Sequence, residues 1–163
     1  MSEQPRDTSL PMTSDGGETP SPRRSSPKPG ATRDAAFGPN RTPFGAIGGE
    51  AGVNELVDRF YDHMDENSAY KVIRDLHPQD LAESREKLKL FLIGWLGGPP
   101  AYVERFGHPR LRMRHAPFPI GEAERDQWLA CMADAMDETG VDGDLRAFLD
   151  ERFAHVADFM RNR

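Results

Sequence analysis

Apolar residues recur at every third or fourth position through much of the chain, a spacing that predicts amphipathic helices. The first stripe lies at 53–64 and consists of Val53, Leu56, Val57, Phe60, Tyr61 and Met64. Tyr61 differs from the others because its hydroxyl needs a hydrogen-bond partner if it is buried. Ser68 comes next, and it is a suitable N-cap for a short helix that ends near Leu76.

Three further stripes follow. The first begins after a His-Pro corner at 77–78 and contains Leu81, Leu88, Phe91, Leu92, Trp95 and Leu96. A Gly-Gly-Pro-Pro run at 97–100 ends it, and a short connector is expected at 101–107. The last two stripes run over 122–138 and 145–160. No segment shows the alternation typical of a strand, so the sequence predicts an all-α fold.

Residues 1–42 lack such a pattern and are predicted to form a disordered Pro/Ser-rich tail before one folded domain at 43–163. Half of the chain's 14 prolines fall in this tail, and Phe37 is its single aromatic residue. A segment with so few apolar side chains cannot offset the entropy lost on ordering. We therefore expect the core to be built from the later part of the chain.

Composition narrows the function classes. The formal net charge of −6 and the pI near 5.4 disfavour a general nucleic-acid binder, which needs a broad basic surface. No apolar run approaches the roughly 20 residues of a membrane span, and the first residues do not resemble a secretory signal. The single cysteine, Cys131, excludes an internal disulfide and any multi-cysteine metal site. We expect a cytoplasmic protein without nucleic-acid or membrane partners.

The segment 108–118 carries the densest candidate chemistry. It holds His108, His115 and three arginines, with apolar residues between them. Arginine donates in pairs to planar anions, and histidine is a frequent ligand of iron and zinc. The combination suits a cofactor that is apolar in the middle and anionic at one edge. A solvated charge cluster with nothing bound is the structural alternative.

Other polar residues on or near the stripes also have ordinary interpretations. A residue such as Tyr61 or Trp128 is about four times more often a core aromatic with one satisfied hydrogen bond than a residue that contacts a ligand. His77, before a proline, is typical of a surface corner. Cys131 is most simply a small core residue, and His63 is expected to face solvent.

Several enzyme classes are disfavoured by missing motifs. There is no His-Glu-x-x-His pair for a zinc hydrolase and no nucleophile elbow for a Ser–His–Asp hydrolase. The Gly-Gly-Pro-Pro run is not a phosphate loop, because it follows a helix and lacks the Lys-Ser/Thr pair. What remains is a histidine beside an anion-binding edge in a helical shell. This combination fits haem, with His115 on the iron and basic residues at the propionates.

At these residues the sequence resembles the truncated haemoglobins, specifically group II of that family, over roughly 44–163. The motifs are Phe-Gly-Ala-Ile-Gly-Gly at 44–49, Arg-Phe-Tyr at 59–61, Phe-Leu at 91–92, Gly-Gly-Pro-Pro at 97–100, Gly-His-Pro-Arg-Leu-Arg-Met-Arg-His-Ala-Pro-Phe-Pro-Ile at 107–120, and Glu-Arg-Asp-Gln-Trp-Leu-Ala-Cys-Met at 124–132. The run at 107–120 is the most specific. The resemblance implies a globin-like two-over-two helical sandwich with an N-terminal extension that the family pattern does not explain.

The resemblance also implies residue roles. His115 matches the proximal histidine that binds the iron of a b-type haem, with its other ring nitrogen donating to a backbone carbonyl. Tyr61 matches the distal tyrosine that donates to bound dioxygen, and Trp128 the tryptophan of polar-pocket members. Ser84 and Leu88 match distal-helix positions that face the ligand. The other implied haem contacts are Lys87 and Arg114 at the propionates, Arg112 and Tyr102 near them, and Phe91, Phe118 and Met132 as apolar wall.

Two positions depart from the family pattern. His77 stands where relatives often carry Phe or Tyr, so a third polar group is expected beside the ligand, titrating near neutral pH. Ser84 is small where other globins place a distal histidine. The ligand is therefore expected to be held from Tyr61, Trp128 and His77.

The implied function is binding of dioxygen and other diatomics such as NO and CO at a His-ligated haem with a polar distal pocket. Several hydrogen-bond donors slow ligand release, which suits reactive oxygen and nitrogen chemistry, such as NO dioxygenation or peroxidase-like activity, better than transport. Turnover needs an external reductase, because the chain has no flavin or NAD motif. The alternatives are a non-enzymatic oxygen store or sensor with the same pocket, and a haem-free helical interaction domain. A homodimer is left open.

Overall fold

The computed structural model describes residues 36–163, and within this range the chain is helical. The elements are α1 (Pro43–Ile47), α2 (Gly49–Glu66), the 3-10 helix η2 (Ser68–Tyr70), α3 (Lys71–Asp75), α4 (Ala82–Trp95), α5 (Ala101–Phe106), α6 (Leu111–His115), α7 (Glu122–Glu138) and α8 (Gly143–Phe159). The described residues form no strand beyond an isolated bridge between Gly38 and Arg41. The predicted all-α class is confirmed.

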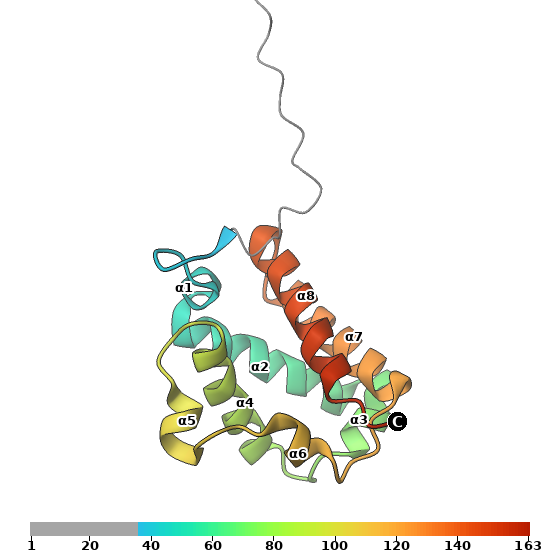
Figure 1. The fold of residues 1–163 in the computed structure, drawn as a ribbon. Coiled ribbons are helices and arrows are strands. Elements are labelled where there is room, and N and C mark those ends of the chain that lie inside the picture. The colour runs from blue at the N-terminus through green and yellow to red at the C-terminus, as the bar shows by residue number, and fades with distance from the viewer. Residues whose placement is uncertain (1–35) are drawn as a thin grey trace, which may run out of the picture. The chain divides into compact units, whose positions relative to one another are not determined.

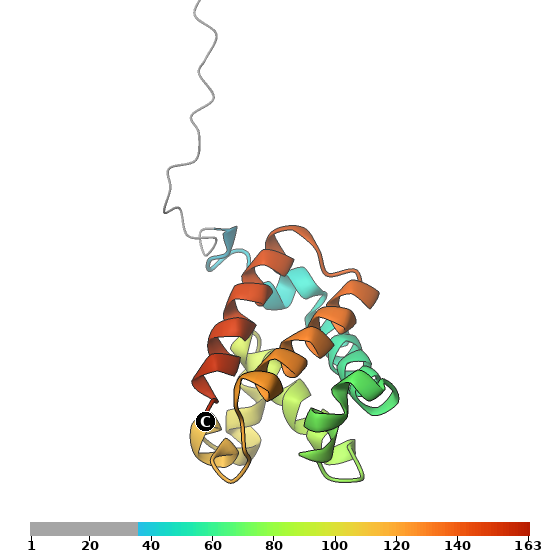
Figure 2. The same cartoon turned by 90° about the vertical axis from the view of Figure 1, so that its right-hand side faces the viewer.

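Four long helices form two pairs. Helix α2 packs against α4, and α7 packs against α8, while contacts between α2 and α7 join the pairs (Figure 1; Figure 2). The short helix α5 packs on α4, and α6 lies at the opposite end of the bundle from α1 (Figure 1). This is the two-over-two arrangement expected from the sequence.

The core lies where α2 meets α7. The whole stripe predicted at 53–64 is buried, and Phe60 at its centre has no exposed surface. Helix α7 contributes a second buried row, made of Cys131, Met132, Ala135 and Met136. Burying a side chain of the size of Phe60 or Met132 stabilises the fold by about 1.5–3 kcal/mol. The α2–α7 contact is therefore the main source of stability near the predicted distal residues.

Two glycines shape the end of α4. Gly97 has a φ of 101°, in the left-handed region that favours glycine. A Cβ on Gly98 would lie 2.7 Å from the Ile93 carbonyl oxygen and 2.9 Å from the Phe44 ring. Phe44 N–H also donates to Leu96 O at 2.9 Å. The glycine pair therefore lets α1 dock on the end of α4.

Some local predictions were wrong. Asn67, not Ser68, caps the turn after α2, because its Oδ1 accepts from Ala69 N–H at 3.0 Å. The connector expected at 101–107 contains helix α5. His63 does not simply face solvent, since its Nε2 pairs with Glu138 on α7. Each difference depends on a backbone turn or a distant partner that residue spacing alone does not reveal.

The predicted boundary at residue 42 falls inside the described part of the chain. Phe37 lies edge-on to Phe148 of α8 with ring centroids 5.1 Å apart, and the Arg41 guanidinium lies 4.9 Å from the Phe37 ring centroid. Contacts with the helices thus begin upstream of the predicted boundary. The rest of the predicted tail, residues 1–35, lies outside the described residues.

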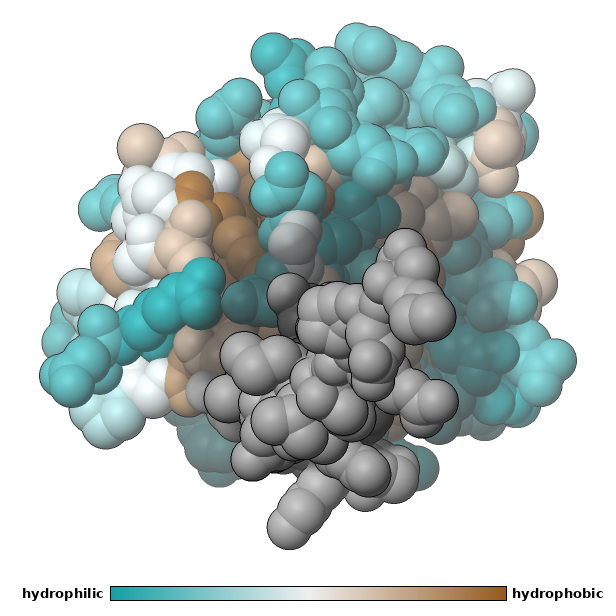
Figure 3. All heavy atoms as spheres, turned by 90° about the horizontal axis from the view of Figure 1, so that it is seen from above, coloured by the Kyte–Doolittle hydropathy of each residue, from teal (hydrophilic) through white to brown (hydrophobic). Residues whose placement is uncertain are grey.

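The face of the described chain seen in Figure 3 is mostly hydrophilic, with hydrophobic side chains gathered mainly in one area. None of the described helices is long and apolar enough to cross a membrane.

Candidate functional site

His115 lies at the end of α6 and is partly buried. Its Nδ1 lies 2.6 Å from Leu111 O, one helical turn earlier, so Nδ1 must carry the proton and donate to this carbonyl. The neutral ring then presents the lone pair of Nε2, the form in which histidine binds metals. The hydrogen bond to a backbone carbonyl expected for a proximal histidine is present.

The neighbouring arginines diverge. The Arg114 guanidinium lies 5.9 Å from the ring centroid of Tyr102 on α5. The Arg112 guanidinium instead lies 5.4 Å from the ring centroid of Phe159, at the end of α8. Arg114 and Tyr102 are thus brought together as expected, whereas Arg112 contacts a different part of the fold.

A basic edge forms where α4 meets α5. Lys87 Nζ pairs with Glu83 at 2.7 Å and lies 5.6 Å from the Phe106 ring centroid. Tyr102 and Phe106 are ring neighbours at 5.1 Å, so Lys87 and Arg114 flank one aromatic pair. These two cations lie on the same side of the fold, as expected of groups that bind the acidic side chains of one cofactor.

Tyr61 lies on α2 and is 5 % exposed. Its ring packs against Phe60 at 5.0 Å and against His77 at 5.8 Å. No described residue hydrogen-bonds to its hydroxyl. Burial raises the pKa of the Tyr61 phenol, and the charge of Arg85 opposes this shift. Tyr61 is therefore a neutral donor at physiological pH with no protein acceptor.

His77 lies beside Tyr61 at the corner after α3. Its Nδ1 donates to Ile73 O at 2.7 Å. Burial lowers the pKa of His77; the bond to Ile73 opposes the shift, and the charges of Arg74 and His115 add to it. Titration near neutral pH is therefore not supported, and the neutral ring presents Nε2 as an acceptor.

Trp128 lies on α7 and is partly buried. Its ring lies 5.3 Å from Phe60 and 5.6 Å from Phe153, and no residue in the described range accepts from its indole N–H. The indole nitrogen is not fully buried, so it can still donate to a ligand or to water. Trp128 and Tyr61 thus both contact Phe60, and both retain an unused donor.

The remaining predicted residues differ in accessibility. Ser84, Leu88 and Phe91 on α4 are partly buried and remain available to a ligand. Phe118 is 40 % exposed. Met132 is fully buried in the core, so its first role is packing. Ser84, Leu88 and Phe91 are therefore accessible to a ligand, whereas Met132 is not.

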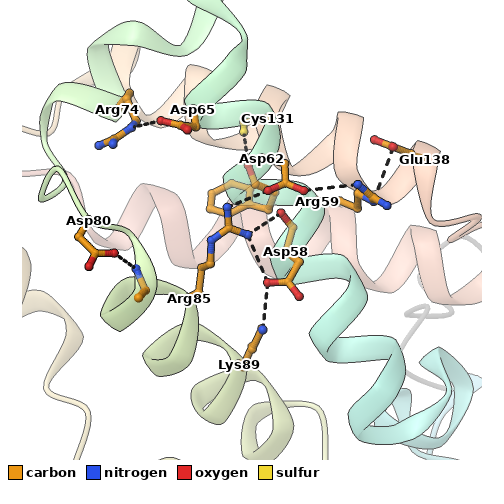
Figure 4. Close-up of polar contacts among 12 residues, drawn as sticks. Asp58, Arg59, Asp62, Asp65, Arg74, Asp80, Arg85, Lys89, Cys131 and Glu138 are labelled. Carbon is orange, nitrogen blue, oxygen red and sulfur yellow. Dashed lines mark hydrogen bonds and ion pairs between the residues drawn. The ribbon is translucent and has the colours of Figure 1, made fainter.

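Sequence reasoning missed an ionic network on the outer side of α2. Arg85 of α4 donates to Asp58 and Asp62, which flank Tyr61 along α2 (Figure 4). The four-residue spacing of the two aspartates was the available signal, since residues i and i+4 share a helix face. A partly buried pair was missed as well: the Tyr70 hydroxyl donates to Asp134, which lies 64 positions away in the sequence.

A surface cleft elsewhere on the molecule does not contain these residues. It has a volume of about 330 Å3, lies between α1 and the turn joining α7 to α8, and is lined by Arg41, Glu55, Asp142 and Asp144 among others. No group of three or more His, Cys, Asp or Glu is placed to hold a metal ion anywhere in 36–163. A single-histidine site at His115 therefore needs a cofactor that supplies the other ligands to its metal.

Two helix pairs, α2 with α4 and α7 with α8, joined through contacts between α2 and α7, form the arrangement of a two-over-two globin. A model of the bacterial-like globin family matches residues 42–162. The group 2 truncated haemoglobin YjbI of Bacillus subtilis (strain 168) is 45 % identical over 121 residues, which are 74 % of this chain and 89 % of that protein.

Solved structures agree with this assignment. The group II 2-on-2 haemoglobin of Agrobacterium tumefaciens is 47 % identical with a TM-score of 0.72, over 74 % of this chain and 94 % of that one. A truncated oxygen-avid haemoglobin from Bacillus subtilis is 45 % identical with a TM-score of 0.69, over 74 % and 99 % of the two chains. The chain belongs to the bacterial-like globin family, among its group II truncated haemoglobins.

Membership of this family implies a haem cofactor, and the donor set fits one. His115 Nε2 is free to bind iron, while Lys87 and Arg114 form a basic edge. Large apolar side chains near these groups remain exposed, with Met113 at 59 % and Phe118 at 40 %. Exposed side chains of this size beside a free metal ligand are typical of a surface that a flat apolar group covers.

Proposed function

We propose that this chain binds b-type haem through His115 and retains dioxygen, or another diatomic ligand, beside Tyr61 and Trp128. The observation that carries the proposal is that the Tyr61 hydroxyl and the Trp128 indole N–H, whose rings both contact Phe60, hydrogen-bond to no residue of 36–163. Neither donor atom is fully buried, so each keeps accessible surface from which it can donate to a ligand. We propose 43–163 as the haem-binding domain.

Each side of the site has its own task. Nδ1 of His115 donates to Leu111 O, which fixes the ring and directs Nε2 to the metal. Lys87 and Arg114 hold the carboxylates at the cofactor's edge, Tyr102 supports Arg114, and Phe91 and Leu88 exclude water. Ferrous haem supplies the coordination position for the diatomic ligand and the redox chemistry. Tyr61 and Trp128 donate to that ligand and slow its escape.

His77 acts differently from the third donor expected from the sequence. With Nδ1–H committed to Ile73, the neutral ring offers Nε2 as an acceptor. It therefore acts on the ligand through a water molecule that donates both to His77 Nε2 and to the ligand, because the single O–H proton of Tyr61 is already donated to the ligand. Ser84, which is small, leaves room for such a water.

Slow ligand release favours reactive chemistry over transport. The Bacillus subtilis relative is described as oxygen-avid, in keeping with donors of this kind. We propose that the site converts nitric oxide and dioxygen to nitrate, a reaction in which the haem would supply one electron per turnover and an external reductase would return it. A store or sensor would need no such reductant.

The Tyr61→Phe variant tests the donor role. Losing one hydrogen bond to the ligand is expected to raise the oxygen dissociation rate about tenfold, as measured by stopped-flow displacement with carbon monoxide. Tyr70→Phe is the matched control, since Tyr70 is also buried but its hydroxyl donates to Asp134. Equal rates in wild type and Tyr61→Phe would contradict the donor role.

Nitric oxide consumption tests the reaction. Catalytic removal requires a reductant and continues beyond one equivalent of protein, whereas a store or sensor consumes at most one equivalent. A single-equivalent burst that is unchanged by added reductant would favour the store or sensor.

A further inference from the structure

The Arg85 side chain links α4 to α2 beside Tyr61 of the candidate distal site. Its Nη1 lies 3.0 Å from Asp58 O and 3.2 Å from Asp58 Oδ1, and its Nη2 lies 2.7 Å from Asp62 Oδ1 (Figure 4). Asp58 and Asp62 precede and follow Tyr61 on α2. The guanidinium therefore binds the helix on both sides of Tyr61, from the residue next to Ser84.

The two aspartates are held by other cations as well. Lys89 Nζ pairs with Asp58 at 2.9 Å, one turn further along α4. Arg59 lies 3.4 Å from Asp62 and 3.7 Å from Glu138 of α7 (Figure 4). The carboxylates that bind Arg85 thus belong to a network across α4, α2 and α7. Ion pairs in such a network stabilise a fold more than isolated surface ion pairs do.

Arg85 also acts on the Tyr61 ring itself. Its guanidinium carbon lies 5.8 Å from the ring centroid, within the range of a cation–π interaction. The Arg85 side chain is 25 % exposed, so water screens its charge only in part. A positive charge beside a phenol favours the phenolate and so makes the O–H a stronger hydrogen-bond donor.

We propose that Arg85 is a positioning residue for Tyr61, fixing this stretch of α2 against α4 and polarising the phenol toward the ligand. The inference rests on the proposed function, because it assumes that Tyr61 donates to a diatomic ligand. Arg85 itself touches neither cofactor nor ligand. Its effect on ligand escape passes through Tyr61, and this separates it from a general stabilising residue.

The chain offers a close control in Arg146. The Arg146 side chain is 24 % exposed and pairs with Asp137 at 2.6 Å and Asp150 at 3.0 Å. It joins α7 and α8 by the same kind of two-aspartate arrangement and makes no contact with Tyr61. Loss of Arg146 therefore removes comparable ionic contacts without changing the surroundings of the phenol.

The test uses the full haem-loaded chain in six forms: wild type, Arg85→Gln, Arg85→Lys, Arg146→Gln, Tyr61→Phe and the double variant Tyr61→Phe/Arg85→Gln. The oxygen dissociation rate and the C–O stretching band of the carbon monoxide form are measured in each. Arg85→Gln is expected to release oxygen about three to ten times faster and to shift its C–O band toward that of Tyr61→Phe. Arg85→Lys should fall between wild type and Arg85→Gln, and Arg146→Gln should match wild type.

The double variant decides between positioning and general stability. If Arg85 acts through Tyr61, adding Arg85→Gln to Tyr61→Phe leaves both readouts where Tyr61→Phe alone puts them. Additive effects, or an Arg85→Gln protein that behaves like Arg146→Gln, overturn the inference. If Tyr61→Phe itself matches wild type, the proposed donor role fails first, and the inference fails with it. If Arg85→Gln does not fold, Arg85→Lys and its double variant with Tyr61→Phe supply the same comparison.

Discussion

The two sides of the candidate haem site are built in different ways. The distal wall, formed by α2, α4 and α7, places Tyr61 and Trp128 against Phe60, which is fully buried. The proximal segment, residues 107–121, contains α6, and none of the residues of this helix is buried. The histidine expected to bind iron thus lies in the less tightly packed half.

The proximal segment is held instead by the C-terminal residues that follow α8. Asn162 Oδ1 accepts from Ile120 N–H at 3.0 Å, and its Nδ2 donates to Phe118 O at 2.8 Å and His115 O at 3.4 Å. The comparison suggests that core packing fixes Tyr61 and Trp128, the expected donors to the diatomic ligand, whereas hydrogen bonds and the cofactor hold His115, the expected ligand of the iron. The predictions below test this difference between the distal and the proximal side.

The largest expected effect is on stability. Phe60→Ala should lower the free energy of unfolding by about 3–5 kcal/mol, because it leaves a cavity between α2 and α7. Met113→Ala removes a side chain that is 59 % exposed and should cost no more than about 0.5 kcal/mol in the haem-free protein. Urea unfolding followed by circular dichroism measures both. Similar losses in the two variants would remove the distinction between the two halves.

The next effect is on haem retention. Asn162→Ala should speed haem loss to an excess of a haem-capturing apoglobin about three- to tenfold, because three hydrogen bonds to the proximal segment are lost. Asn67→Ala is the control, since it removes an asparagine cap far along the sequence from α6. Haem loss at the same rate in both variants would show that Asn162 does not hold the proximal side.

The sequence revealed the distal wall better than the proximal one. Periodicity predicted the buried stripe of α2 because a long helix repeats its apolar face over several turns. It missed α5 and left α6 inside a loop, because five or six residues between glycines and prolines are too short to show a period. The hydrogen bonds of Asn162 join positions more than 40 apart, and no local pattern encodes them.

The residues of the candidate site were also predictable to different degrees. The histidine-rich run made His115 visible, and the resemblance to a known family supplied the distal set. The role of His77 depends on a hydrogen bond to Ile73 and on burial, so its low pKa could not be foreseen. The network of Arg85 was hidden because charged residues on helices usually face solvent.

A smaller effect concerns pH and the distal wall. Burial opposes ionisation of Asp58, but hydrogen bonds and charge from Lys89 and Arg85 lower its pKa below the ordinary value near 3.8. Asp58 therefore stabilises the fold above that value, and the contribution is lost as pH falls through the lowered pKa. Asp58→Asn should lower the free energy of unfolding by up to about 1 kcal/mol at pH 7 and by almost nothing at pH values below the lowered pKa of Asp58. Urea unfolding at several pH values checks this, and a difference that grows toward acid would contradict it.

The smallest effect is expected at the basic edge. Lys87→Gln and Arg114→Gln should each increase the rate of haem loss by about twofold, since exposed ion pairs contribute little. The increase should shrink at high salt, because ions screen exposed charges. Arg112→Gln, whose guanidinium lies against Phe159, should change the rate less than Arg114→Gln. A larger effect of Arg112→Gln than of Arg114→Gln would mean that Arg112, not Arg114, belongs to the basic edge.

The central claim is that His115 Nε2 is the protein ligand of the haem iron. It is tested most directly by the iron–histidine stretching band in the resonance Raman spectrum of the ferrous protein. We expect this band in wild type, its loss in His115→Gly, and its return when imidazole is added to that variant. The same band in wild type and His115→Gly without imidazole, or no haem spectrum in the reconstituted wild type, would contradict the claim.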